Sequence, residues 1–362
     1  MTILSKDLIG VKQSVVDEIL LLNPIQIPMI TLLGFGEAIT NTRHEWYEDS
    51  MFATESTITA AATATDGTLK VANTEPFRKD LVIQVKDELI YVYSVNEVTK
   101  ELSVTRGFAN TTPAAIAVNT KATVMFVDSK EARDARDDRF KKRVPGHNIT
   151  QVFDDSIKVS GTAESVVQYG IANQYSYEKA KKQRELALQL EQAIINGIEY
   201  QDGDKRYMRG IREYIRTNVT EAGNAPLIMD MINDLAQSLY ERGAFKTGGD
   251  FRVIVGAKQK RAIGKFDETK IRLVRDDGTR GNSVDRLVTD FGEFPVELNN
   301  NLRPDELLLI DKNRAVIRPV KDRAFFHKYL GDMGDYTKGM IVGEYTLEFK
   351  QEAAHGRIKG LA

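Results

Sequence analysis

The sequence predicts an α+β fold, and three features of the chain lead to this prediction. Residues 176–198 repeat apolar side chains at the spacing of one long amphipathic helix. Residues 67–127 contain short β-favouring runs between turn residues, which is typical of a small all-β unit. Residues 341–349 alternate apolar and polar side chains, so we expect a strand with one buried face and one mostly solvated face. Helical and strand-rich segments that occupy separate parts of a chain indicate an α+β architecture.

Length, charge and cysteine content limit the classes of protein to consider. The chain has 362 residues, of which 42% are hydrophobic, and this is enough for two or three compact units with a sizeable core. Lys and Arg number 50 and Asp and Glu 52, so the net charge of -2 argues against a protein whose main role is to grip nucleic-acid phosphates. The absence of cysteine excludes disulfides, thiolate zinc sites and cysteine nucleophiles.

The N-terminal region predicts a helix followed by an extended arm. Apolar residues recur at near-helical spacing over residues 7–22, and Pro24 ends the pattern. Residues 25–30 alternate and include Pro28, which favours an extended segment lying on another surface. The start of the chain lacks the pattern of a signal peptide, and the apolar stretch at residues 25–35 is too short and too interrupted to span a membrane. We therefore expect a soluble protein with no membrane partner.

A polar and aromatic stretch at residues 40–50 leads into the β unit. The single tryptophan, Trp46, suits either an anchor between subunits or a core position, and the sequence leaves both open. The β unit has enough predicted strands to close into a small barrel. These strands are residues 68–71, 81–85, 89–95, 102–105 and 122–127.

A strongly charged segment, residues 128–143, follows the β unit. Its seven basic and five acidic side chains leave a charge of +2. Such a mixture is typical either of a solvated helical face with ion pairs at helical spacing or of a salt-bridge strip between subunits. Under the second interpretation Arg133, Arg136 and Arg139 join Trp46 as candidate inter-subunit contacts.

The helix at residues 176–198 is uninterrupted by Pro or Gly before Gly197, and at 1.5 Å per residue it would span roughly 30 Å. A second helix is predicted to start near residues 224–226, where Asn suits a cap and Pro the first turn. Residues 251–255 read as a buried strand and residues 257–263 as a short helix.

No pattern of catalytic, metal-binding or cofactor-binding residues is found. The four histidines, His44, His147, His327 and His355, lack the paired spacing of a helical zinc site. The phrase GDMGDY at residues 331–336 lacks most ligand positions of a calcium loop, so a glycine-driven turn is the better interpretation. Arg106 and Gly107 begin a turn that lacks the Lys-Ser/Thr ending of a phosphate-binding loop. The Gly-X-Ser-X-Gly motif of a serine nucleophile does not occur. We therefore predict that the protein is not an enzyme and has no cofactor or metal.

The last third of the chain carries a series of phrases that resemble one known family. They are VDRLVTDFG at residues 284–292, LLLID at 307–311, GEYTLEF at 343–349 and AHG at 354–356. In this order and spacing they resemble the C-terminal part of tailed-phage major capsid proteins of the Hong Kong 97-type fold. The resemblance implies a long spine helix, an extended loop that reaches over a neighbour, an axial part near the symmetry axis and, here, an inserted small β-barrel-like module.

The resemblance also divides the chain into expected parts. They are an N-terminal arm (residues 1–39), a first extended-loop strand (40–55), the inserted β-module (56–127), a return strand and spine-helix peripheral domain (128–223), an axial domain (224–302) and C-terminal peripheral strands (303–362). The strands of the extended loop are expected at residues 40–50 and 148–160.

The function implied is that of a structural subunit of an icosahedral head that encloses double-stranded DNA. The expected partners are further copies in hexamers and pentamers, scaffold, portal and decoration proteins, and packaged DNA bound without sequence specificity. The expected location is the virion capsid, assembled in the host cytoplasm. The sequence leaves two alternatives open, namely a nanocompartment shell of the same fold and a surface- or carbohydrate-binding protein that acts through the β-module.

Overall fold

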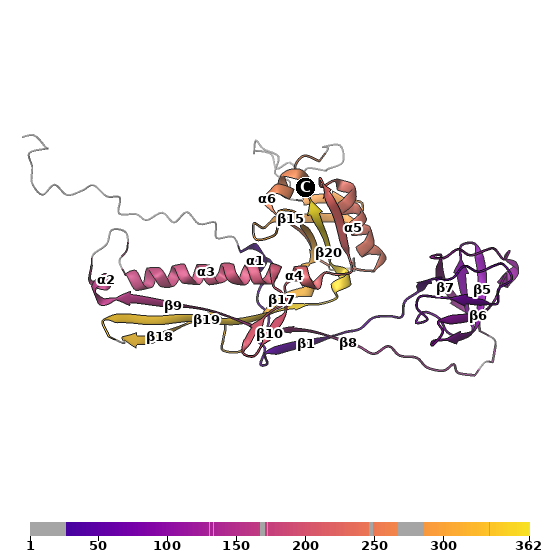
Figure 1. Ribbon diagram of the computed structural model, residues 1–362, viewed down its shortest axis with the longest axis horizontal. Helices are drawn as coiled ribbons and strands as arrows, with labels where there is room; N and C mark the ends of the chain where they lie inside the picture. Colours follow the sequence, from indigo (N-terminus) through magenta and orange to yellow (C-terminus); the bar gives the residue numbers. More distant parts are fainter. Residues whose placement is uncertain are drawn as a thin grey trace, which may run out of the picture. The chain divides into compact units, whose positions relative to one another are not determined.

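The computed structural model describes residues 27–129, 131–132, 134–166, 171, 173–245, 249–266, 286–332 and 334–362. The chain divides into two compact units (Figure 1). The first contains the described chain up to Trp46 together with Pro145–Ala362, and the second is Tyr47–Val144. The helix predicted at residues 7–22 lies outside the described residues. Among those described, no helix is long and apolar enough to cross a membrane.

The long helix of the first unit is α3 (Gln174–Asn196), close to the predicted range. The Asn173 side chain caps its start by accepting a hydrogen bond from Ser176 N at 2.7 Å, and the helix ends at Gly197. The buried face packs along strands β9 and β19 (Figure 1). Its buried residues are Leu186, Leu190, Glu191, Ile194 and Ile195.

The sheet beneath α3 is built around one long strand. Its members are β9 (Gln151–Ser160), β17 (Ala315–Pro319), β18 (Phe326–Asp332) and β19 (Tyr336–Phe349). Strand β19 pairs antiparallel with each of the other three. The prediction of a solvated face on residues 341–349 is wrong, because Glu344, Thr346 and Glu348 are at most 5% exposed. Neighbouring segments cover this face and supply partners for its polar groups, as described below.

The extended prediction for residues 25–30 is wrong at residues 28–30, which begin a short helix, α1 (Pro28–Leu33), and residues 25–26 lie outside the described residues. Pro28 occupies its first turn, where a missing N–H costs no hydrogen bond. The buried Glu191 carboxylate on α3 accepts hydrogen bonds from the N–H groups of Met29 (2.8 Å) and Ile30 (2.9 Å) and from Asn299 Nδ2 (2.8 Å). The extended prediction fails at residues 28–30 because this cap comes from a distant part of the chain.

A second sheet in the first unit has the strand order β12-β20-β16-β13-β15-β14. The strands are β12 (Val219–Ala225), β13 (Phe251–Val255), β14 (Arg286–Thr289), β15 (Gly292–Leu298), β16 (Leu307–Asp311) and β20 (Gly356–Leu361). Helices α5 (Met229–Glu241) and α6 (Ala257–Ile263) share one core with it. The predicted strand at 251–255 and helix at 257–263 are confirmed. The predicted helix start near residue 224 is wrong, because Ala225 still pairs with Leu361 of β20.

Smaller elements complete the first unit and its edge. Strand β1 (Arg43–Glu48) pairs with β8 (Val144–Ile149), and β10 (Tyr200–Asp202) pairs with β11 (Lys205–Tyr207). Two short helices, α2 (Gly161–Ser165) and α4 (Ile211–Tyr214), flank α3 along the chain. The strand expected at residues 148–160 is therefore two strands, of which β8 pairs with β1 and β9 pairs with β19.

The second unit is a six-stranded sheet with the order β2-β7-β4-β5-β6-β3. Its strands are β2 (Glu55–Thr57), β3 (Thr68–Lys70), β4 (Leu81–Val85), β5 (Glu88–Asn96), β6 (Glu101–Thr105) and β7 (Lys121–Val127). All five predicted strands are confirmed, and β2 was missed. Hydrogen bonds from Thr59 N to Lys70 O and from Ala72 N to Thr57 O, each 2.9 Å, connect the chain beside β2 to that beside β3. The sheet thus closes on itself around a core that includes Ile83.

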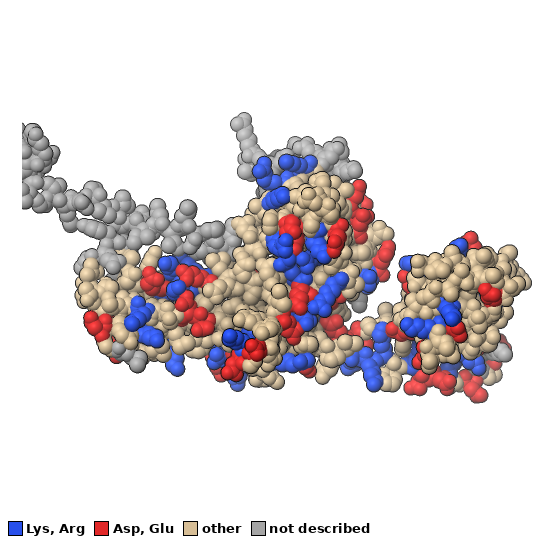
Figure 2. Space-filling view, viewed as in Figure 1, with Lys and Arg blue, Asp and Glu red and all other residues tan. Residues whose placement is uncertain are grey.

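Charged side chains of both signs lie side by side over much of the face in Figure 2. This mixture agrees with the small net charge of -2. A surface of this kind has no single large field that would attract a polyanion over the whole molecule.

Candidate subunit-interaction site

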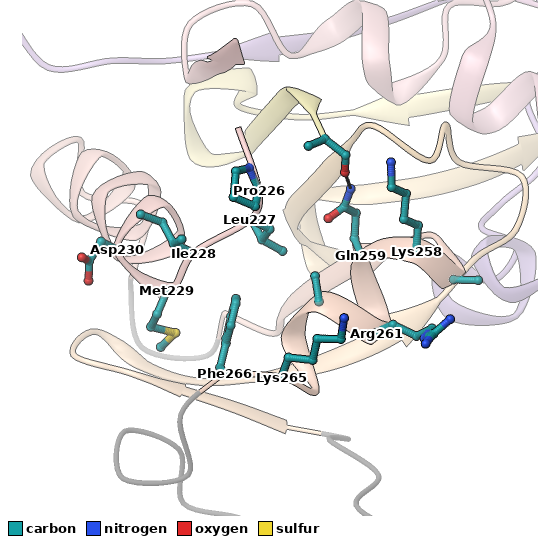
Figure 3. Close-up of a pocket in the computed structure, with 13 residues that line it drawn as sticks. Pro226, Leu227, Ile228, Met229, Asp230, Lys258, Gln259, Arg261, Lys265 and Phe266 are labelled. Carbon is teal, nitrogen blue, oxygen red and sulfur yellow. Dashed lines mark hydrogen bonds between the residues drawn. The ribbon is translucent and has the colours of Figure 1, made fainter. Parts of the chain in front are cut away.

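A groove of about 950 Å³ lies between the start of α5 and helix α6 (Figure 3). Leu227 and Phe266 belong to its apolar lining, and Lys258, Arg261 and Lys265 provide its basic side chains. The lining contains no serine, threonine, tyrosine or histidine. An apolar surface bordered by charged side chains is typical of a surface that binds another protein.

The histidines are distributed among separate contacts. Within the described ranges, no three His, Asp or Glu side chains gather as a metal ion requires. His44 Nε2 lies 2.7 Å from Glu348, His147 Nε2 lies 3.1 Å from Glu199, and His327 Nε2 lies 2.8 Å from the Tyr175 hydroxyl.

His355, within the AHG phrase, is fully buried and structural. Its Nδ1 accepts a hydrogen bond from Asp311 N at 3.2 Å, and its Nε2 lies 3.2 Å from Lys350 O. The ring also lies against Phe349, with centroids 4.1 Å apart. Burial lowers the pKa of His355 to about 3, while the Lys350 carbonyl opposes the shift and the Arg314 charge adds to it. The imidazole is therefore neutral in the folded protein.

This burial predicts a loss of stability in mild acid. The unfolded chain takes up a proton near pH 6.5 that the folded chain does not take up until about pH 3. Stability is thus fully present above pH 6.5 and decreases as the pH falls, by about 2 kcal/mol by pH 5. The check is urea unfolding of wild type and His355→Gln at pH 7 and 5, and we expect a smaller pH effect in the variant. The control is His147→Gln, at a side chain 30% exposed; an equal pH effect in wild type and His355→Gln would contradict the prediction.

Trp46 lies in the core of the first unit. It is 7% exposed, and its ring centroid is 5.8 Å from that of His44 and 6.2 Å from that of Tyr214. Gly146 of β8 approaches the ring so closely that a Cβ there would lie 2.6 Å from Trp46 Cε2. Of the two positions that the sequence left open for Trp46, the structure shows the core position within the subunit. Contact between Trp46 and a neighbouring subunit stays a prediction.

The charged segment at residues 128–143 has no helix in its described residues, so the interpretation as a helical face is wrong. Arg139 lies over the Phe52 ring, 3.9 Å from its centroid, and donates to Glu75 O at 3.3 Å. Burial and the nearby Arg78 charge lower the pKa of Arg139. Arg136 donates to Asp128 O, and Arg133 lies outside the described residues. Their role between subunits stays a prediction.

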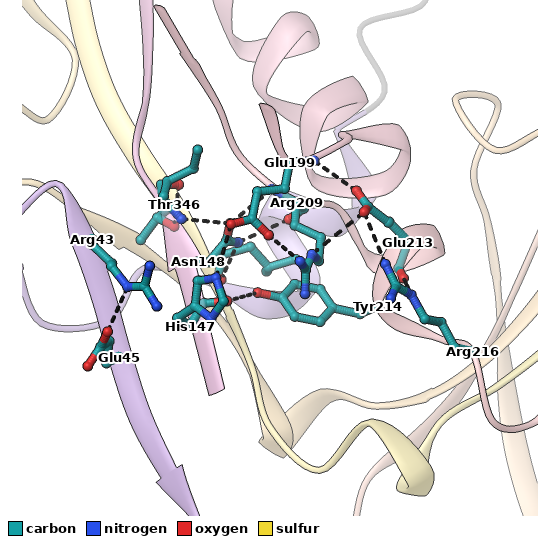
Figure 4. Close-up of polar contacts among 12 residues, drawn as sticks. Arg43, Glu45, His147, Asn148, Glu199, Arg209, Glu213, Tyr214, Arg216 and Thr346 are labelled. Carbon is teal, nitrogen blue, oxygen red and sulfur yellow. Dashed lines mark hydrogen bonds and ion pairs between the residues drawn. The ribbon is translucent and has the colours of Figure 1, made fainter. Parts of the chain in front are cut away.

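A polar cluster fixes strand β8 to the rest of the first unit (Figure 4). Asn148 donates through Nδ2 to Leu347 O (2.7 Å) and Arg209 O (3.0 Å), and its Oδ1 accepts from Arg209 N (2.9 Å). The Tyr214 hydroxyl donates to His147 O at 2.8 Å. One side chain thus joins β8, β19 and the loop before α4, and no pattern in the sequence predicted this role for Asn148.

The carboxylates of this cluster are paired (Figure 4). Glu199 contacts His147 and Arg209, and its own N–H donates to Glu213 at 2.8 Å. Glu213 in turn contacts Arg216 at 3.2 Å. A carboxylate that is already paired with cations is poorly placed to act as a general base. The cluster therefore serves structure, at the place where β8 joins the first unit.

Strand β19 carries two buried carboxylates, Glu344 and Glu348, whose burial was not predicted from the sequence. Glu344 accepts from Thr150 Oγ1 (2.7 Å), Arg206 Nη2 (2.9 Å) and Arg323 Nε (2.7 Å). Burial by itself would raise the pKa of Glu344, but these partners outweigh it and hold the pKa below its usual range. Burial would also raise the pKa of Glu348, but its contacts with His44, Arg318 and Lys350 outweigh burial and lower the pKa. Both groups stay ionised and tie distant segments to the central strand.

Comparison with solved structures identifies the fold. A chain from the capsid of cyanophage A-1(L) is 8% identical, with a TM-score of 0.59 over 99% of this chain and 98% of that chain. A chain from the capsid of the native GTA particle is 11% identical, with a TM-score of 0.54 over 99% of this chain and 98% of that chain. A chain of the SrpI encapsulin complex of Synechococcus elongatus PCC 7942 is 9% identical, with a TM-score of 0.44 over 61% of this chain and 78% of that chain. No curated protein sequence matches the chain.

The mixed α+β architecture and the likeness to these two capsid chains show that the protein has the Hong Kong 97-type capsid fold. The sequence matches the family described as SU10 major capsid protein over residues 2–362. The chain belongs to the SU10 major capsid protein family, and it is a non-enzymatic structural subunit of the icosahedral shell of phage heads. The resemblance stated from the sequence is confirmed.

Proposed function

We propose that copies of this chain assemble as hexamers and pentamers into a closed head that encloses double-stranded DNA. The family match over residues 2–362 is the observation that carries the proposal. Closed symmetric assembly repeats a few contacts many times, so each subunit needs complementary surfaces on different sides. The near-neutral charge of -2 suits a wall that does not grip the phosphates of packaged DNA tightly.

In this proposal each part of the chain has a role in the shell. Helix α3 is the spine of the peripheral domain, β1 and β8 form the extended loop, and the second unit is an inserted module. The division into residues 1–39, 40–55, 56–127, 128–223, 224–302 and 303–362 remains part of the proposal. Trp46, Arg136 and Arg139, with Arg133 outside the described residues, are the proposed contacts near the loop. Scaffold, portal and decoration proteins are the proposed further partners, and the host cytoplasm is the proposed place of assembly.

Negative-stain electron microscopy of the full chain, expressed alone and at high concentration, tests this proposal. We expect closed shells or rings of five and six subunits. Particles that stay monomeric under every assembly condition tried, including addition of a candidate scaffold protein, would contradict it. Shells that purify with an enzyme cargo and no DNA from infected cells would favour a nanocompartment instead.

A further inference from the structure

Helix α6 presents a basic face to solvent. Lys258, Arg261 and Lys265 are three and four residues apart, so they lie on one side of the helix and its C-terminal end. All three are exposed, and α6 contains no acidic residue. In the described part of the chain no ion pair or side-chain hydrogen bond engages any of them. Three unpaired cations on one helical face repel each other, so an acidic partner would stabilise them.

Helix α5 presents an acidic face of matching length. Asp230, Asp234, Gln237 and Glu241 are spaced by four, three and four residues and are all exposed. The helix contains no basic residue. Asp230 and Asp234 have no ion-pair partner within the described residues, and Glu241 accepts only from Gln237, at 2.9 Å. The two helices therefore carry opposite charges that their own subunit does not neutralise.

The basic face borders the apolar groove of Figure 3. Ile228, in its wall, is 46% exposed, which leaves apolar surface that an incoming side chain can cover. Tyr240, beside the acidic face of α5, is 61% exposed. An aromatic side chain that enters an apolar groove rimmed by charges is typical of a protein interface. Acidic residues and an aromatic side chain on α5 thus complement cations and a groove beside α6.

The acidic face begins at Asp230, on the α5 side of the groove, and the basic face lies on the α6 side. In Figure 3 the carboxyl group of Asp230 points away from the groove, whereas Lys258, Arg261 and Lys265 lie on the opposite wall. Figure 2 shows basic side chains gathered over α6 and acidic side chains along the outer side of α5. Because the acidic and basic faces are separate patches, the acidic face of one copy can meet the basic face of the next, as in a contact repeated head to tail around a ring.

We propose that the acidic face of α5 in one copy docks on the groove and basic face of α6 in the next copy. This inference rests on the proposed assembly into rings and names the surface that would hold neighbouring subunits together. Opposite charges across an interface steer subunits into register, and like charges placed there oppose association. Because these charges are exposed, the contact should weaken as the salt concentration rises.

A charge-swap experiment on the full chain tests the proposal. Lys258→Glu/Arg261→Glu should lower the assembled fraction about ten-fold or more, measured by size-exclusion chromatography and electron microscopy. Asp230→Lys/Asp234→Lys should have the same effect. A chain that carries all four substitutions restores opposite charges between neighbours, and we expect assembly to return to within about two-fold of wild type. The matched control is Lys86→Glu/Lys100→Glu, which reverses two exposed lysines of the second unit and should leave this contact intact.

The outcomes separate this contact from the proposed function. If wild type forms no ring or shell, the proposed function fails. If wild type assembles and both swapped pairs assemble equally well, the contact is wrong while the proposed function stands. If each pair abolishes assembly but the combined chain does not recover, the two faces do not meet each other, and the proposed contact is wrong. Unchanged circular dichroism and melting temperature exclude misfolding as the cause of any loss.

Discussion

Replacing Arg106 with Ala should lower the free energy of unfolding of the second unit by about 3–5 kcal/mol. Arg106 Nε and Nη2 donate to the two oxygens of Glu88 at 2.8 and 2.7 Å. Glu88 also accepts from Gly107 N at 3.0 Å and Ala114 N at 3.2 Å. The two side chains are only 6% and 3% exposed, so removal of the cation leaves a carboxylate that water barely reaches.

The pKa of Glu88 gives the expected pH dependence of this pair. Burial would raise the pKa of Glu88, but Arg106 and the two backbone N–H groups outweigh burial and hold the pKa below its usual range. A carboxyl group with a lowered pKa stabilises the folded state above its unfolded pKa, near 4.5, and the contribution disappears as the pH falls through the folded value. Arg106→Ala should therefore be most harmful near neutral pH.

Thermal and urea unfolding of the full chain measure the effect of Arg106→Ala, and we expect an earlier transition for the second unit. The matched control is Lys70→Ala, which breaks an ion pair with Glu101 between side chains 58% and 33% exposed. Lys70→Ala should lower the free energy of unfolding by at most about 1 kcal/mol. Equal losses in the two variants would show that the Arg106 pair contributes no more than a surface contact.

The parts predicted correctly from the sequence are those that local pattern determines. Helix α3 repeats apolar residues along 23 positions, and the five predicted strands of the second unit alternate between turns. Strand β2 has the sequence EST beside an Ala- and Thr-rich stretch and contains no large apolar residue, so it shows no alternation that would predict a strand. The start of α5 was misplaced because pairing with β20 overrides the local signals of Asn224 and Pro226.

The candidate site was harder to predict because its contacts join residues far apart in the sequence. Alternation placed Glu344 in solvent, yet its partners Arg206 and Arg323 come from separate segments and cover it. The sequence left Trp46 open between an anchor and a core position, and it did not show that the ring packs on Tyr214. The opposite charges of α5 and α6 are visible in the sequence. That these charges are exposed, and that they have no internal partners among the described residues, could be seen only in the structure.

Glu306→Ala should destabilise the first unit by about 3–5 kcal/mol, because the Glu306 carboxylate holds two nearly buried cations. Its oxygens accept from Arg212 Nε (2.7 Å) and Nη2 (2.6 Å) and from Arg357 Nη2 (2.7 Å). The Arg212 side chain, on α4, is 18% exposed, and that of Arg357, on β20, is 14% exposed. Without the carboxylate these two guanidinium groups repel each other with little water to screen them. Arg212 also donates to Asn196 Oδ1 at 2.8 Å, so the loss of stability should extend to the end of α3.

Urea unfolding of the full chain distinguishes this junction from an ordinary ion pair. Glu306→Gln keeps the shape and one acceptor oxygen but loses the charge. Its free energy of unfolding should therefore lie between those of wild type and Glu306→Ala. Glu293→Ala is the matched control, because its contact with Arg286 is 3.7 Å long between side chains 58% and 63% exposed. Glu293→Ala should change stability by less than about 1 kcal/mol. A Glu306→Ala variant as stable as Glu293→Ala would mean that water reaches both arginines in solution, and that the Glu306 carboxylate contributes little to the junction between α4 and β20.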